Sequence, residues 1–128
     1  MYESITSYLG KLKPAEIVPP KKTGENSFIM GYPRYDEVVS ELMHKMYDVV
    51  PNGGQNYDKV VYKNTGVDCH EDLSKIDISN LDGETILFII FSVIRDERFC
   101  DGLVSSYIQN GAMDKWLSRL KEIDEQNK

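Results

Sequence analysis

Two arginines three residues apart carry the strongest chemical signal in this 128-residue sequence. Arg95 and Arg98 share one face of a helix beside Phe91, because residues three apart are neighbours on a helical surface. Guanidinium groups next to an aromatic ring hold a phosphate or a carboxylate through paired N–H donors. Together with Arg119 they would form an anion clamp in a small-molecule binder or an enzyme. The alternative, which the excess of carboxylates favours, is that each arginine pairs with a nearby acid.

The cysteines and histidines are poorly placed for catalysis or for metal binding. Cys100 falls on the Ile89 face of a continued helix, so we expect a small buried apolar residue. A cysteine nucleophile needs a histidine base within reach, and the spacing brings neither His44 nor His70 close to it. Cys69 and His70 are adjacent and lack the second pair of ligands that a zinc site requires. The sequence therefore predicts no metal and no cofactor.

An acidic segment, residues 67–84, holds six acidic residues and one lysine. Four of the acids are candidates for contact with a partner: Asp68, Glu71, Asp72 and Asp77. The whole chain has 15 basic and 21 acidic residues, a net charge of −6. Such a balance disfavours direct nucleic-acid binding, which depends on lysine and arginine at the phosphates. An exposed acidic strip would suit a basic groove on a protein.

Tyrosine is the most frequent aromatic residue, with eight copies against four phenylalanines and one tryptophan. Tyrosine is enriched where one side of a ring packs and the other meets water or a partner. Four tyrosines from the middle of the chain are candidates for a binding surface: Tyr32, Tyr35, Tyr57 and Tyr62. The alternative is that they lie at the rim of an ordinary core.

Helices must position these side chains. Residues 84–101 contain no glycine or proline, and the run 86–94 has only one polar member, Ser92. A strand would also suit this composition, but the length favours a buried helix with Asp82 as its N-cap. If this helix continues, Glu97 lies on its buried side, and a buried carboxylate is costly unless paired. The sequence therefore predicts either an early end of the helix or a partly buried Glu97 that pairs with arginine.

Further helices are predicted on both sides of this central one. They are a short helix over 5–12 that Pro14 ends, a helix that begins near Pro33, a short helix after Asn56, and two C-terminal helices with apolar residues over 103–108 and 113–123. Residues 13–31 are expected to form an irregular arm with a mobile loop over 21–26, and residues 124–128 a frayed tail. The prediction is a single all-α domain over 1–128, a compact array of five to six helices around a buried central helix.

The C-terminal third resembles a family of bacterial proteins known only as a domain of unknown function. The similar residues are Ile94-Arg95-Asp96-Glu97-Arg98-Phe99-Cys100-Asp101-Gly102, then Asn110-Gly111, then Leu117-Ser118-Arg119-Leu120. They match a pattern I-R-x-x-R-F-x-x-G followed by a glycine and L-x-R-L, within residues 81–123. Upstream, Gly31-Tyr32-Pro33 is similar, whereas the aromatic-rich middle of the family is missing. The resemblance supports the fold and the choice of residues, and it implies no activity.

We therefore expect a non-enzymatic module that binds a protein partner through the tyrosines or the acidic segment. A sharper hypothesis is an acidic inhibitor of a nucleic-acid-binding protein, encoded by a phage or mobile element. The eleven lysines against four arginines are typical of AT-rich bacterial or phage genomes. The alternatives are an anion binder or enzyme that uses the arginines, and a homodimer formed through an apolar helix face. Neither a signal peptide nor an apolar run long enough to span a membrane is apparent, so we expect a cytoplasmic protein.

Overall fold

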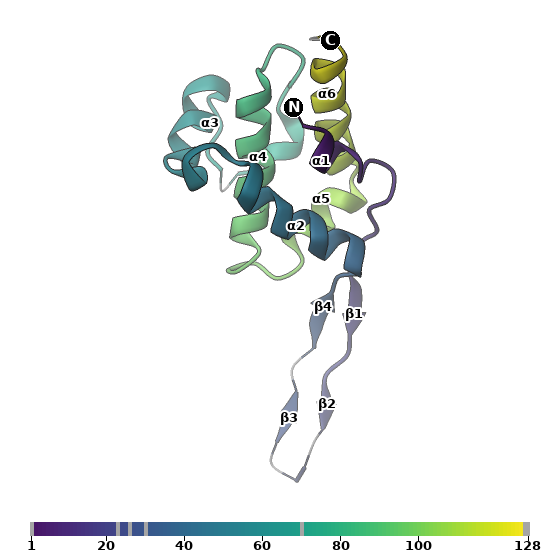
Figure 1. The fold of residues 1–128 in the computed structure, drawn as a ribbon. Helices are drawn as coiled ribbons and strands as arrows, with labels where there is room; N and C mark the ends of the chain where they lie inside the picture. Colours follow the sequence, from purple (N-terminus) through teal and green to yellow (C-terminus); the bar gives the residue numbers. More distant parts are fainter. Residues whose placement is uncertain (1, 23, 26, 30, 70, 127–128) are drawn as a thin grey trace.

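The computed structural model describes residues 2–22, 24–25, 27–29, 31–69 and 71–126, and it confirms a mostly helical fold (Figure 1). The α-helices of these residues are α1 (Glu3–Thr6), α2 (Glu37–Val49), α3 (Tyr57–Thr65), α4 (Gly83–Asp96), α5 (Leu103–Gln109) and α6 (Ala112–Gln126). The strands are β1 (Glu16–Val18), β2 (Lys21–Lys22), β3 (Phe28–Ile29) and β4 (Tyr32–Arg34). Two short 3-10 helices cover Pro51–Gly54 and Leu73–Lys75.

The central helix is α4, as the sequence predicts. Every residue from Thr85 to Ile94 is buried, because α2, α3, α5 and α6 all pack against α4. Burial on all sides explains why this segment is apolar around its whole circumference instead of along one stripe. The Asp82 carboxylate accepts a hydrogen bond from the Thr85 N–H at 2.8 Å, which confirms the predicted N-cap.

The two ends of the chain meet beside α6. The residues Met113, Trp116, Leu117 and Leu120 form its fully buried stripe, and α1 packs against it. The prediction of a tail that frays from residue 124 was wrong for the described residues, because α6 extends to Gln126. Asp124 is buried there, and its carboxylate accepts a hydrogen bond from the Tyr2 N–H at 2.7 Å. This contact joins the last turn of α6 to the start of α1.

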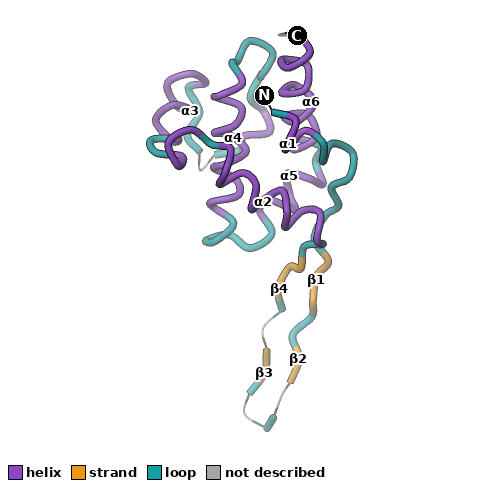
Figure 2. The backbone as a smooth tube through the Cα atoms, viewed as in Figure 1, coloured by secondary structure: helices purple, strands orange, loops and turns teal. Residues whose placement is uncertain are grey.

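The prediction of an irregular arm over residues 13–31 was wrong, because the described residues 16–18, 21–22 and 28–29 are strands of an antiparallel ribbon that projects from the helices (Figure 2). Strand β1 pairs with β4, with Val18 opposite Tyr32, and β2 pairs with β3 farther out. Residues 16–34, which include all four strands, are called the β-arm below. The mobile loop predicted over 21–26 is partly strand, because β2 covers Lys21–Lys22, while residues 23 and 26 lie outside the described residues.

Helix boundaries differ from the sequence prediction at two places. Because Pro33 belongs to β4, α2 begins only at Glu37, after Asp36 has capped it with a 2.9 Å hydrogen bond from the Val39 N–H. Helix α1 ends at Thr6, although an apolar repeat predicted it to reach residue 12. Each difference lies at a helix end, where local propensity is weakest.

Candidate functional site

The β-arm is attached to the helical body through one serine at the start of α5. The Ser105 Oγ accepts a hydrogen bond from the Ala15 N–H at 2.8 Å, just before β1. The Ser105 N–H donates to the Tyr35 hydroxyl at 3.0 Å, just after β4. Both strands of the ribbon are therefore fixed at their base by the same residue.

A carboxylate completes this attachment. Glu97 follows the end of α4 and accepts hydrogen bonds from the N–H groups of Gly102 at 2.6 Å and Val104 at 3.0 Å, at the start of α5. It also accepts a hydrogen bond from the hydroxyl of Tyr35. Burial and this contact with the carboxylate raise the pKa of Tyr35. The early end of the central helix is thus the correct one of the two predicted outcomes, and Glu97 satisfies backbone N–H groups instead of an arginine.

The β-arm exposes apolar side chains near its base. Ile17 is 71% exposed and Tyr32 is 44% exposed. Because residues directly opposite in a strand pair share a face, Val18 and Tyr32 lie together on one face and Ile17 lies on the other. The Arg34 guanidinium pairs with the Glu16 carboxylate at 2.6 Å on the Tyr32 face. Lys21 and Lys22, both exposed, place two positive charges on the outer half of the arm.

The acidic segment is built from two repeats of the same turn. The carboxylates of Asp72 and Asp77 each accept hydrogen bonds from the backbone N–H and the hydroxyl of a serine two residues later, Ser74 and Ser79, at 2.6–3.0 Å. These bonds lower the pKa of both carboxyl groups. Both acids are exposed, as are Asp68 and Glu71. The four predicted acids therefore lie at the surface, and two of them have fixed orientations.

The four candidate tyrosines separate into two pairs. Tyr32 and Tyr62 are 44% and 60% exposed, on the β-arm and on α3. Tyr35 is tied to Glu97, and the Tyr57 ring packs edge-on against the buried ring of Phe91 at 5.4 Å. The structure therefore does not bring the four tyrosines into a single surface, and two of them hold the fold together.

The three candidate arginines are not gathered into one clamp. The Arg95 guanidinium lies over the ring of Tyr57 at 5.8 Å, while Arg98 lines a groove of about 240 Å³ between α2 and the end of α4. Arg119 donates to the Ser79 carbonyl at 3.1 Å, close to the opposite end of α4. A helix of this length places the two ends about 20 Å apart. Among the described residues, no carboxylate forms an ion pair with Arg95 or Arg98, whereas Arg119 pairs with Glu122 at 3.0 Å.

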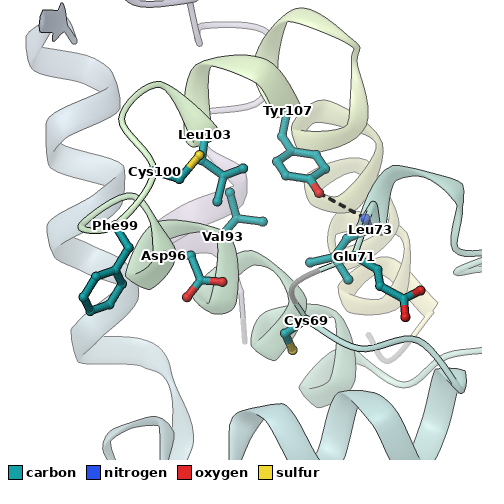
Figure 3. A pocket seen from close by; sticks show the side chains of 9 residues that line it. All are labelled: Cys69, Glu71, Leu73, Val93, Asp96, Phe99, Cys100, Leu103 and Tyr107. Atoms are coloured by element: carbon teal, nitrogen blue, oxygen red, sulfur yellow. Dashed lines mark hydrogen bonds between the residues drawn. The ribbon is translucent and has the colours of Figure 1, made fainter.

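The two thiols lie on one pocket of about 280 Å³ (Figure 3). Its lining residues are Cys69, Glu71, Leu73, Val93, Asp96, Phe99, Cys100, Leu103 and Tyr107. Cys69 is buried, and burial raises the pKa of its thiol to about 11. Cys100 is exposed, so the prediction that it is buried was wrong. The helical wheel that predicted its burial does not apply, because α4 ends at Asp96.

The described residues show neither a metal centre nor a membrane span. No three histidine, cysteine or carboxylate side chains in this part of the chain are grouped so that they could hold a metal ion. His70, next to Cys69, lies outside the described residues. No helix among these residues is long and apolar enough to cross a membrane.

Two residues of the site, Glu97 and Ser105, were not predicted in their actual roles. The sequence did single out Glu97 by its position on the apolar side of the predicted helix, because a carboxylate there is costly unless it has partners. Nothing in the sequence marks Ser105, because its two partners, Ala15 and Tyr35, are 90 and 70 residues away along the chain.

The fold defines an all-α protein with a projecting β-ribbon. The sequence matches the model of a family of unknown function, DUF6508, over residues 2–126, and the chain therefore belongs to this family. No curated protein and no solved structure matches this chain.

Proposed function

We propose that this protein is a non-enzymatic interaction module that binds a protein partner with its β-arm. The observation that carries the proposal is the exposure of Ile17 and Tyr32 on a ribbon whose base is held against the helices by hydrogen bonds to Ser105. An isolated two-stranded ribbon is marginally stable in water. A partner that covers it would remove apolar area from water and pair its unpaired edges.

The chemistry of the β-arm indicates the kind of partner. Among the described residues, β1 pairs only with β4 and β2 only with β3, so an extended segment can add to the outer edge of a strand as a further strand. Lys21 and Lys22 favour acidic side chains on that segment. The partner in this proposal is a protein that offers an extended acidic segment. The charge balance of the whole chain makes nucleic acid a poor alternative, because 21 acidic residues outnumber 15 basic ones.

Capture from a source-organism lysate followed by binding measurements tests this proposal. A captured protein is identified, purified and titrated against variants of this chain. Tyr32→Ala and Ile17→Lys remove apolar contacts from the β-arm, and we expect each to weaken binding at least tenfold. Tyr62→Ala removes a tyrosine of similar exposure from α3 and serves as the matched control. Binding that depends on Tyr62 but not on the two arm residues would contradict the proposal.

The exposed acids support a second candidate, an acidic inhibitor that occupies a basic, nucleic-acid-binding groove. The supporting observation is the fixed, solvent-facing position of Asp72 and Asp77. In this case, association would weaken steeply as salt is added. A phage or mobile-element origin belongs to this candidate.

Charge-neutral variants separate the two candidates. Asp72→Asn and Asp77→Asn keep an oxygen acceptor for the serine N–H groups and remove only the negative charge. Loss of binding in this double variant, with normal binding by Tyr32→Ala, would select the inhibitor. Charge reversal at Asp68, Glu71, Asp72 and Asp77 without loss of affinity would refute it.

A further inference from the structure

The groove between α2 and the end of α4 has an apolar floor. Helix α2 runs across α4 (Figure 1), and Met43 and Tyr47, four residues apart on α2, are neighbours on its surface. Ile94, in the last turn of α4, completes the apolar lining. The volume of about 240 Å³ lies below the usual range for drug-sized ligands. The groove therefore suits a ligand with a single ring or a short alkyl chain.

This floor is both fixed and open to solvent. The Tyr47 ring packs edge-on against the buried ring of Phe91 at 5.3 Å, yet Tyr47 is 46% exposed. The core therefore holds one side of the ring, and the other side is free to cover a ligand. Met43, beside it, is half-buried and has a flexible side chain that adapts to ligands of different shape. A ligand would bury apolar area here without first ordering the protein.

Arg98 gives the groove a positive charge. Its guanidinium lies over the ring of Phe99 at 5.8 Å, and that ring is itself 83% exposed. No carboxylate of the described residues forms an ion pair with Arg98, although the chain has 21 acidic residues. A guanidinium without an ion pair, next to an apolar floor, is complementary to a carboxylate, which it binds through two parallel N–H donors.

Arg95, three residues earlier, has a structural role that Arg98 lacks. Arg95 lies in the last turn of α4, where the helix macrodipole favours a positive charge, and its guanidinium covers the ring of Tyr57. That ring packs against the hydrophobic core. Arg98 follows the end of the helix, and the Phe99 ring that it covers is not part of the core. Stability therefore explains the position of Arg95 and leaves Arg98 available to a ligand.

The carboxylate of Glu97 also lines the groove, but its negative charge is already compensated. Its two oxygens accept hydrogen bonds from the N–H groups of Gly102 and Val104 and from the hydroxyl of Tyr35. None of these three donors lines the groove, so the carboxylate is held towards the base of the β-arm. His44, exposed on α2, also lines the groove and has a ring N–H that can donate to an anion. The groups that remain available to a ligand are therefore donors.

We propose that this groove binds a small organic carboxylate, with its apolar body on Met43, Tyr47 and Ile94 and its carboxylate at the guanidinium of Arg98. The lining residues all lie outside the β-arm. This site therefore does not depend on the proposed protein partner.

Three probes that differ in charge test the proposal: 3-phenylpropanoate, 3-phenylpropanol and 3-phenylpropylammonium. Proton NMR follows the ring signals of His44, which the variant His44→Gln assigns. We expect the carboxylate probe to bind saturably at millimolar concentration or below, to shift these signals, and to bind at least tenfold more tightly than the ammonium probe. Because the net charge of the chain is −6, non-specific attraction would give the opposite order. Equal binding of all three probes, or no saturable shift with the carboxylate probe, would overturn the proposal.

Matched variants test the role of the arginine. Arg98→Gln should weaken the carboxylate probe at least tenfold and leave the neutral alcohol unchanged. Arg95→Gln makes the same chemical change at an exposed arginine outside the groove and should have no effect on either probe. Met43→Ala removes part of the floor and should weaken the carboxylate and the alcohol alike, which keeps the proposal testable if Arg98→Gln does not fold. Carboxylate binding that is unchanged in both groove variants, or that weakens equally in the two arginine variants, would refute the assignment.

Discussion

The hydroxyl of Tyr35 donates a hydrogen bond to the carboxylate of Glu97, and this contact joins the base of the β-arm to the connection between α4 and α5. Glu97 also accepts two backbone N–H groups from the start of α5. One carboxylate therefore satisfies donors from two distant parts of the chain. Residues 35 and 97 are 62 positions apart, so the bond links two segments that are distant along the chain.

Substitution of Glu97 should destabilise the protein. Glu97→Gln removes the charge from three hydrogen bonds, and hydrogen bonds to charged groups contribute about 1.5–3 kcal/mol each at most. Because glutamine retains one oxygen acceptor, we expect a loss of about 1–3 kcal/mol in the free energy of unfolding, measured by urea titration. Glu122→Gln, which removes a carboxylate from a surface ion pair with Arg119, should cost less than about 1 kcal/mol.

A double-mutant cycle isolates the bond between the two side chains. Tyr35→Phe removes the hydroxyl and leaves the ring in place. Tyr35→Phe and Glu97→Gln should be coupled by about 1 kcal/mol, because the first removes the donor of this hydrogen bond and the second removes the charge of its acceptor. Strict additivity would show that the contact does not contribute to stability.

The second prediction concerns the attachment of the β-arm. Ser105→Ala removes the acceptor of the Ala15 N–H and should increase the mobility of the arm, with only about 0.5–1.5 kcal/mol lost from the body. Amide NMR relaxation would detect this as lower order parameters in residues 16–34. Ser106→Ala is the control, because the Ser106 Oγ bonds only to the Gly102 carbonyl in the same segment. Equal effects of the two serine variants would show that Ser105 does not hold the arm.

The core helix and its cap are the parts of the fold that the sequence specifies most directly. Residues 84–101 contain neither glycine nor proline, and Asp82 stands at the correct distance to cap the first turn. Both signals are local, so they need no knowledge of distant contacts. The same local reasoning left the end of the helix open, and it wrongly predicted a buried Cys100 from the wheel of a helix that continues past Asp96. The helix ends there with Glu97 satisfying Gly102 and Val104, a contact that a helical wheel does not represent.

The β-arm shows the other limit of local reasoning. Its strands have only two or three residues each, and prolines and glycines within the region are typical of irregular loops. What makes them strands is pairing, for example of Val18 with Tyr32, across fourteen residues. The sequence identified the candidate tyrosines, but it did not predict which of them are exposed and which of them hold the fold together. Exposure of Tyr32 and attachment of Tyr35 both follow from where the arm leaves the body.

The third prediction concerns Gly54, which lies against the buried ring of Phe91. A Cβ at this position would be 2.2 Å from Phe91 Cε2, and the backbone φ is +80°. The ring has little freedom to move, because Tyr47 and Tyr57 pack edge-on against it at 5.3 and 5.4 Å. Gly54→Ala should therefore cost about 1–3 kcal/mol for overpacking in addition to about 1–2 kcal/mol for the left-handed backbone.

The neighbouring glycine separates these two costs. Gly53 has a φ of +66°, but a Cβ there would meet nothing within 4 Å. Gly53→Ala should lose only the backbone part, about 1–2 kcal/mol. Urea unfolding of both variants measures the loss of unfolding free energy in each. The difference between the two losses is the cost of the contact with Phe91. If both variants lose the same free energy, then the ring moves aside at little cost.

The fourth prediction concerns stability at alkaline pH. Burial raises the pKa of the Cys69 thiol from 9.0 to about 11, so the folded protein holds this proton more tightly than the unfolded chain does. The resulting stabilisation is fully present below pH 9 and is lost as the pH rises from 9 towards about 11. Burial also raises the pKa values of Tyr35, Tyr57 and Tyr107, which extends the loss of stability to pH values above 10.

Urea unfolding across this pH range checks the prediction. The free energy of unfolding of the native sequence should be constant up to pH 9 and should then decrease. Cys69→Ala removes the titrating thiol and should make the decrease between pH 9 and about 11 shallower. Cys100→Ser, which changes the exposed thiol, is the control and should follow the native curve. A Cys69→Ala curve parallel to the native one would show that this thiol does not couple folding to pH, because the remaining decrease would belong to the tyrosines.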